Sequence, residues 1–357
     1  MQVRIIGRGR EPSMRVLVTG ATGFTGGHAM AALQRNGHEP VAFVRNAEKL
    51  ELMVRLHGLT AVEHRLGDIT DPASVQAAVA DCEAVIHTAA TVSFDPADAA
   101  AMAATNIAGV RAVLDAAAIA GCDPIVHVSS TSALFPPAGD IVRSDDPVPE
   151  AKTDYAHTKA ACEHHARRLQ ESGAPVVIFY PGGIVGPTDA GSHVVGEGWR
   201  EALRPGWVPV ITRGGTSYID VRDLTAAMVV ALEPGRGPRR YMAGGTFVDW
   251  TQNADALDAA TGKTWKRRRV PGRLMETAGR VGDVIARVRP NWTPPIGYEA
   301  ATTMTRSVPT DDSALRDELG IDYRPLDESL GDMIAWLVSQ GRWDPVDAPR
   351  WGDRGPQ

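Results

Sequence analysis

Hydrophobic positions in the first half of the chain fall into short apolar runs that alternate with longer stretches of helical spacing. The β-branched runs predict strands at residues 15–19, 40–44, 61–66, 84–87, 124–128 and 176–180. Apolar residues at helical spacing predict helices at residues 28–36, 97–120 and 154–171. Strands and helices that alternate in this way are typical of βαβ units, so the pattern predicts an α/β fold built on a parallel sheet.

The pattern changes after residue 180. Residues 181–216 are rich in Gly, Pro and Trp and show little periodicity, which is typical of loops that enclose a ligand. A strand and a helix at 217–233 are expected to rejoin the sheet. Short strands and helices then predict a smaller C-terminal lobe formed by residues 181–216 and 234–341.

Both ends of the chain differ from this pattern. Residues 1–13 are arginine-rich and polar without the hydrophobic core of a signal peptide, and we expect a disordered leader. Residues 342–357 are rich in Pro, Gly, Asp and Trp, and this composition predicts a poorly ordered tail. The domain prediction is therefore 14–180 with 217–233 for the main domain, and 181–216 with 234–341 for the lobe.

Composition excludes several classes of protein. With 43% hydrophobic and 22% charged residues the chain is an ordinary globular protein, and its net charge of −6 argues against a nucleic-acid partner. Cys82, Cys122 and Cys162 form no CxxC pair, so no disulfide framework and no metal site is expected. No run approaches the roughly 18 apolar residues of a membrane span. We therefore expect a cytoplasmic protein without an integral membrane segment.

A glycine-rich turn follows the first strand. Gly20, Gly23 and Gly26 lie between this strand and a helix, in the run TGATGFTG. Glycines at such a turn let the backbone approach a pyrophosphate, and the helix N-terminus supplies NH groups and positive potential. The spacing is GxxGxxG rather than the standard GxGxxG. We predict that this turn binds a dinucleotide through Gly20, Thr22, Gly23, Phe24, Thr25 and Gly26.

The end of the second strand indicates which dinucleotide is bound. An acidic residue there would bond the ribose 2′-hydroxyl of NAD, whereas an arginine pairs with the 2′-phosphate of NADP. The strand ends in Arg45 and carries no carboxylate. NADP(H) is therefore the predicted cofactor, and the alternative is that Arg45 is an ordinary surface residue.

Two later strand ends fit the rest of this cofactor. Residues Asp68 and Ile69 follow the third strand, where they could meet the adenine. Small residues follow the fourth strand, where the backbone could approach the nicotinamide-side ribose: Thr88, Ala89 and Ala90. Either segment could instead be ordinary strand-end turn chemistry.

Tyr155 and Lys159 lie four residues apart in a predicted helix, and hence on one face of it. A free tyrosine has a pKa of about 10, and a nearby ammonium group would favour the phenolate and make it an effective acid–base catalyst. The strand at 124–128 runs out into Ser129, Ser130, Thr131 and Ser132, which are candidate donors to a substrate carbonyl. Asn106 could hold a water molecule that relays protons to Lys159.

These motifs resemble the extended short-chain dehydrogenases/reductases, also called the NAD-dependent epimerase/dehydratase family. The resemblance runs from residue 14 to about 337 and includes TGATGFTG, GDITD, HTAA, HVSSTSALF, YAHTK, YPGGIVGP and SYIDVRDLTAAM. It implies a Rossmann doubly wound parallel sheet with a smaller C-terminal substrate-binding lobe. It further implies that Tyr155 is the acid–base catalyst and that Lys159 lowers the pKa of Tyr155 and bonds the nicotinamide ribose. Thr131 would donate to the substrate carbonyl, and Asn106 would hold a water molecule. Further cofactor contacts would come from Tyr180, Pro181, Gly182 and Ile184.

Within the family, Arg45 resembles the dihydroflavonol reductase and hydroxysteroid dehydrogenase branch, which acts on bulky apolar alcohols and ketones. The alternative is a nucleotide-sugar epimerase or dehydratase, many of which carry an arginine where this chain has Tyr180 before Pro181. A second alternative is a regulator that binds NADP(H) without turnover, although both Tyr155 and Lys159 are present. The resemblance also implies a possible homodimer through the long helices.

Contacts to a small-molecule substrate are expected from Ser93, Phe94, His193 and Trp199. One further segment, residues 273–289, is a basic helix with a single apolar stripe. Three roles fit this helix: a lid packed over the substrate, an oligomer contact, or a membrane-surface helix. The stripe consists of Leu274, Ala278, Val281, Ile285 and Val288.

Overall fold

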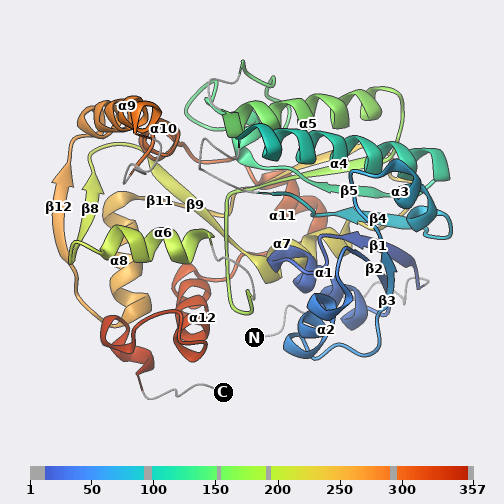
Figure 1. Cartoon of the computed structure of the whole chain (residues 1–357), viewed down its shortest axis with the longest axis horizontal. Coiled ribbons are helices and arrows are strands. Elements are labelled where there is room, and N and C mark those ends of the chain that lie inside the picture. Colours follow the sequence, from blue (N-terminus) through green and yellow to red (C-terminus); the bar gives the residue numbers. More distant parts are fainter. Residues whose placement is uncertain (1–12, 92–98, 151–153, 190–193, 290–295, 353–357) are drawn as a thin grey trace.

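The structure is a computed structural model that describes residues 13–91, 99–150, 154–189, 194–289 and 296–352 (Figure 1). Nearly all of the predicted leader, and the predicted substrate contacts Ser93, Phe94 and His193, lie outside the described residues. The side chain of Tyr155 lies outside them as well, although its backbone is part of a helix.

A central sheet of seven parallel strands confirms the predicted α/β fold. The strand order is β10-β6-β5-β4-β1-β2-β3. This order is that of a doubly wound Rossmann sheet extended by one strand. The strands are β1 (Arg15–Thr19), β2 (Glu39–Val44), β3 (Glu63–Leu66), β4 (Ala84–His87), β5 (Ile125–Val128), β6 (Val176–Pro181) and β10 (Arg239–Ala243).

Helices cover both faces of this sheet (Figure 1). Side chains alternate along a strand, so Val16 and Val18 pack on one face while Leu17 packs on the other. The first face is covered by α1 (Phe24–Arg35), α2 (Ala47–Leu56), α7 (Val221–Val230) and α11 (Ser313–Leu319). The second is covered by α3 (Pro72–Val79), α4 (Ala99–Ala120) and α5 (Asp154–Glu171).

One helix, α4, is long and apolar enough to cross a membrane by length and composition alone. It packs against α3 and α5 and contributes Val110, Val113 and Leu114 to the core beside the sheet. A core helix of a doubly wound fold meets the same two criteria, so α4 is weak evidence for a membrane span.

The C-terminal lobe has a core of its own, rich in tryptophan. Its three-stranded sheet consists of β7 (Gly183–Val185), β9 (Gly215–Asp220) and β11 (Thr246–Asp249), and its two-stranded sheet of β8 (Trp207–Ile211) and β12 (Lys266–Val270). The helices of the lobe are α6 (Val194–Leu203), α8 (Trp250–Thr261), α9 (Gly272–Val288), α10 (Tyr298–Arg306) and α12 (Leu326–Ser339).

Two strands have partners other than those expected. The strand predicted near 217 is β9, which pairs with β7 and β11 instead of rejoining the central sheet, while the following helix α7 does return to it. The seventh strand of the central sheet is β10, which lies within the range predicted for the lobe. Apolar spacing predicts that a strand exists but carries no information on which neighbour completes its hydrogen bonds.

The predicted disordered tail is also wrong over most of its length. Residues 342–352 contain two short helical turns, the second of which packs against α8 and α12, and Trp343 and Trp351 are buried in the core of the lobe. Burial of two large aromatic rings outweighs the Pro- and Gly-rich composition on which the prediction rested.

Candidate active site

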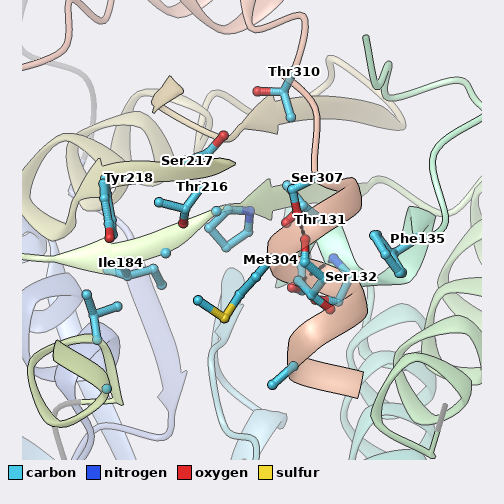
Figure 2. A pocket seen from close by; sticks show the side chains of 18 of the residues that line it. Thr131, Ser132, Phe135, Ile184, Thr216, Ser217, Tyr218, Met304, Ser307 and Thr310 are labelled. Carbon is cyan, nitrogen blue, oxygen red and sulfur yellow. Dashed lines mark hydrogen bonds between the residues drawn. The ribbon is translucent and has the colours of Figure 1, made fainter. Parts of the chain in front are cut away.

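A cavity of about 830 Å³ lies between the carboxyl ends of the central strands and the C-terminal lobe. One wall contains the glycine turn before α1 and the residues that follow β4, β5 and β6. The opposite wall comes from α6, β9, α8 and α10. Figure 2 shows side chains from both walls gathered around this space, with Thr131 and Ser132 on one side, Tyr218 on the other and Met304 between them. This is the place where ligands of doubly wound sheets bind.

The glycine turn at the cavity is tightly built from backbone alone. Gly20 has φ +72°, and a Cβ there would lie 2.7 Å from the backbone nitrogen of Ala89. A Cβ on Gly26 would collide with the carbonyl oxygen of Gly20. Helix α1 begins at Phe24 with Gly23 as N-cap, and no side chain caps its first turn. The NH groups of that turn are therefore suited to binding a phosphate.

Arg45 lies at the end of β2, and 78% of its side chain is exposed. Its guanidinium is 3.9 Å from the Asp68 carboxylate, a loose contact. Asp68 accepts hydrogen bonds from the backbone and hydroxyl of Thr70, at 2.8 and 2.7 Å, and these bonds lower its pKa. The two predicted residues thus lie side by side beyond β2 and β3. The Ile69 side chain packs into the protein, against Gly109 of α4, and the predicted contact of this segment with the adenine stays a prediction.

The four hydroxyls after β5 divide into two pairs. Ser129 is buried and donates to Glu163 at 2.9 Å, and Ser130 caps the helical turn η2 (Thr131–Leu134) by accepting from the backbone of Ser132. All four residues line the cavity, but the hydroxyls of Ser129 and Ser130 already form these hydrogen bonds within the protein. Thr131 and Ser132 (Figure 2) therefore remain the candidates for the carbonyl donor.

Helix α5 brings Lys159 of the predicted catalytic pair to the cavity. Lys159 is buried and lines the cavity together with Ala156. Tyr155 lies in the first turn of α5, one turn before Lys159, so the two residues occupy one face of the helix. The catalytic role of Tyr155 stays a prediction, as does that of Lys159.

Behind the cavity, Glu163 is the centre of a buried polar cluster. Its carboxylate accepts from Tyr180 Oη at 2.5 Å and from Arg167 Nε at 2.7 Å, in addition to Ser129. Burial is the first cause that raises the pKa of the Tyr180 phenol, and Glu163 raises it further. Alternation along β6 turns the Tyr180 ring toward α5, so its side chain belongs to this cluster, and the predicted cofactor contact at Tyr180 stays a prediction. The other predicted contacts after β6 do line the cavity: Pro181, Gly182 and Ile184.

Asn106 holds the loop after β4. Its amide accepts from the backbone nitrogen of Thr91 and donates to the carbonyl oxygen of the same residue, both at 2.8 Å. Together the two bonds leave one N–H hydrogen and one oxygen lone pair of the amide, so the predicted water-holding role stays a prediction. Thr88 donates to the carbonyl oxygen of Thr19 at 2.8 Å, which fixes the backbone of this segment beside Gly20.

Trp199, a predicted substrate contact, lines the lobe side of the cavity. Its indole donates to Tyr218 Oη at 3.0 Å, and Tyr218 donates to Asn253 Oδ1 at 2.8 Å. Burial raises the pKa of Tyr218 to about 12. Tyr218, Asn253 and Met304 were not predicted, because they come from three lobe elements whose packing on the cavity has no signal in the sequence.

Comparison with known proteins identifies the family. A family model described as the NAD dependent epimerase/dehydratase family matches residues 16–244, which contain the glycine turn, the β5 hydroxyls and α5. The chain belongs to this family. Sterol demethylase protein B of Methylococcus capsulatus is 31% identical over 331 residues, covering 92% of this chain and 99% of that protein. A putative dihydroflavonol 4-reductase of Synechocystis is 26% identical, covering 91% of this chain and 94% of the relative.

Solved structures of the family share its fold. A UDP-glucose-4-epimerase from Stenotrophomonas with bound NAD superimposes with a TM-score of 0.73 at 24% identity, covering 92% of this chain and 99% of that one. The epimerase/dehydratase family consists of enzymes that depend on a nicotinamide dinucleotide, and this chain has the fold and the glycine turn of such an enzyme. Among the residues that the structure describes, no cluster of three metal-ligating side chains occurs.

Proposed function

We propose that this protein is an NADP(H)-dependent oxidoreductase that interconverts a carbonyl and an alcohol on a bulky, largely apolar substrate. The observation that carries the proposal is the composition of the cavity. One end has Lys159 and Thr131 beside the glycine turn, and the rest is walled mainly by apolar side chains such as Trp199, Leu203 and Met304.

The residues present fit a bound dinucleotide. A side chain at Gly20 or Gly26 would collide with neighbouring backbone atoms, so the glycines keep this tight turn, and the first turn of α1 offers its NH groups to a pyrophosphate. When bound, the nicotinamide supplies or accepts a hydride. In the reductive direction Thr131 would hold the carbonyl oxygen, Tyr155 would donate a proton to it, and the Lys159 ammonium would favour the resulting phenolate.

Arg45 supports NADP(H) over NAD(H). Its guanidinium is exposed and its contact with Asp68 is long, so little free energy is lost when it turns to a 2′-phosphate. Arginine binds a phosphate in a bidentate manner, which a neutral residue at this place could not do.

Charge in the cavity supports an apolar substrate. Among the described lining residues, the one basic side chain is Lys159, which the proposed mechanism already uses. A nucleotide-sugar substrate would carry a diphosphate into a cavity that offers it no further cation. The relatives named as a sterol demethylase protein and a dihydroflavonol reductase agree with a bulky ring substrate.

The first experiment measures oxidation of NADPH and NADH against aldehydes, aryl ketones, flavonoid-like ketones and ketosteroids. We expect NADPH-dependent turnover of an apolar ketone by the native protein and at least a 100-fold loss of kcat in Tyr155→Phe. Tyr241→Phe is the matched control, since this ring packs behind the sheet and its hydroxyl bonds Glu318. NADPH binding without turnover of any ketone would overturn the proposal and favour nucleotide-sugar chemistry or a non-catalytic regulator.

A second experiment tests the cofactor. We expect Arg45→Asp to weaken NADPH binding at least tenfold relative to NADH, because the new carboxylate repels the 2′-phosphate and can bond a 2′-hydroxyl. Arg55→Asp on α2 is the control, because this side chain is also exposed, at 68%, and pairs loosely with Glu51. An unchanged preference in Arg45→Asp would show that Arg45 does not select the cofactor.

A further inference from the structure

Helix α9 has its polar and apolar faces reversed relative to an ordinary surface helix. Its inner face, which packs on α10, contains glycines and carboxylates. A Cβ on Gly279 would lie 2.9 Å from the Cα of Tyr298, so the two helices are in close contact. Glu276 is buried there and is paired with Arg213 and with Arg306 at 2.9 Å. The helix is therefore held in place by polar contacts on its inner side.

The outer face of α9 is apolar. The four large exposed hydrophobic side chains of this helix follow one another at intervals of seven, three and four residues, which places them in one stripe. Their exposed fractions are 61% for Leu274, 53% for Val281, 58% for Val284 and 74% for Val288. A contiguous apolar stripe of this kind marks an interaction site on a soluble protein, whereas single exposed apolar residues do not.

Positive charge flanks this stripe. Arg273, Arg280 and Arg289 are exposed, while both carboxylates of α9 are turned toward the protein: Glu276 bonds Arg306 and Asp283 accepts from the backbone of Tyr298 at 3.1 Å. The neighbouring edge strand β12 adds an exposed basic run at the same end of the lobe (Figure 1). The outer surface of α9 is thus apolar and cationic together.

We propose that α9 docks this protein on the surface of a bilayer that contains anionic phospholipid. Apolar side chains in one stripe with arginines beside them are the chemistry of an interfacial helix. A second copy fits less well, because a symmetric contact through this face would bring arginines of both copies together. The lid, one of the three roles that the sequence left open, has no support in the cavity, since no described residue of α9 lines it.

The docking site is linked to the cavity through α10. Glu299, Thr303 and Met304 of α10 line the cavity, and α9 packs on this same helix. If the proposed function holds, docking through α9 places the cavity close to the bilayer in which an apolar substrate is dissolved. Docking itself does not depend on the reaction, and it is measured without substrate.

The test is co-sedimentation of the full chain with vesicles of phosphatidylcholine alone or mixed equally with phosphatidylglycerol. We expect binding to the mixed vesicles that weakens with salt, and at least tenfold weaker binding of the double variant Val281→Asp/Val284→Asp. Ile119→Asp is the matched control, because this side chain is 82% exposed on α4 and should leave binding unchanged. A second variant, Arg273→Glu/Arg289→Glu, reverses two charges and leaves the apolar stripe intact. It should also lose binding to the mixed vesicles.

Three outcomes would overturn the proposal: no binding to mixed vesicles, equal binding by the native protein and both α9 variants, or conversion of a native dimer into a monomer by Val281→Asp/Val284→Asp. The last would assign the stripe to a second copy of the chain. NADPH affinity and the thermal midpoint are measured for every variant and are expected to stay unchanged. A failure of the proposed function, seen as absent ketone turnover, would leave the vesicle result standing, so the two failures are distinguishable.

Discussion

Removal of the Glu163 carboxylate tests how strongly the buried cluster behind the cavity stabilises the fold. Glu163 has no exposed surface, and it accepts from Ser129, Tyr180 and Arg167 within 2.9 Å. In Glu163→Ala these donors lose their common acceptor, and the Arg167 guanidinium, whose side chain is 14% exposed, loses its carboxylate partner.

The expected magnitude follows from these contacts. Breaking a buried ion pair by removing one partner costs about 3–5 kcal/mol, because the remaining charge is uncompensated. In Glu163→Gln the amide oxygen can still accept from Tyr180 and Arg167, and the amide nitrogen can donate to Ser129. The bonds with Tyr180 and Ser129 become neutral, which costs about 1 kcal/mol for each of these two bonds, whereas the bond from Arg167 keeps its charged donor. We therefore expect Glu163→Ala to lose more of the free energy of unfolding than Glu163→Gln.

The assay is equilibrium urea unfolding followed by tryptophan fluorescence, with the free energy of unfolding compared among the variants. Glu201→Ala is the control, because its pair with Arg204 is exposed at 61% and 77% and should contribute less than about 0.5 kcal/mol. The double variant Glu163→Ala/Arg167→Met should lose at least about 1 kcal/mol less than the sum of the single variants. Equal stability of Glu163→Ala and Glu201→Ala would refute the reasoning.

Two further predictions concern the cofactor turn and acid stability. Gly26→Ala should weaken NADPH binding at least tenfold, measured by fluorescence titration, because the new methyl group collides with the Gly20 carbonyl oxygen; unchanged affinity would contradict this reading of the turn. Burial lowers the pKa of His28 to about 3, so this ring stays neutral in the folded protein while the unfolded chain takes up a proton below about pH 6.5. Its contribution to stability is complete above pH 6.5 and is lost as the pH falls toward 3. The variant His28→Gln can still donate to the Pro187 carbonyl but takes up no proton in this pH range. Its free energy of unfolding, measured with urea, should therefore fall by about 2 kcal/mol less between pH 7 and pH 5 than that of the native protein. Parallel pH profiles of the two proteins would contradict this prediction.

Local pattern was sufficient to predict the α/β fold. Buried parallel strands must be apolar on both faces, and the helices between them must present one apolar side, so β1, β4 and α5 were predicted with the bounds that the structure has. The glycine turn was predicted equally well, because the backbone approaches so closely at Gly20 and Gly26 that no residue with a Cβ fits there. Residues that follow the strands were predicted to meet at one place, since the carboxyl ends of parallel strands share one edge of the sheet.

The tertiary structure alone decided which side chains face the cavity and which face away. Tyr180 lies next to Pro181 in the chain, yet one points into the protein and the other lines the cavity, because neighbouring residues of a strand face opposite ways. Tyr218, Asn253 and Met304 meet there only through packing of separate lobe elements.

The orientation of α9 is a second feature that the sequence alone did not determine. Its sequence contains a clear apolar stripe, and such a stripe normally faces the protein. Polar contacts of Glu276 and Asp283 with α10 and its neighbours hold the opposite face inward, and the stripe is left outside. Spacing along the chain determines which residues share a face, whereas the partners available in the folded protein determine which way that face points.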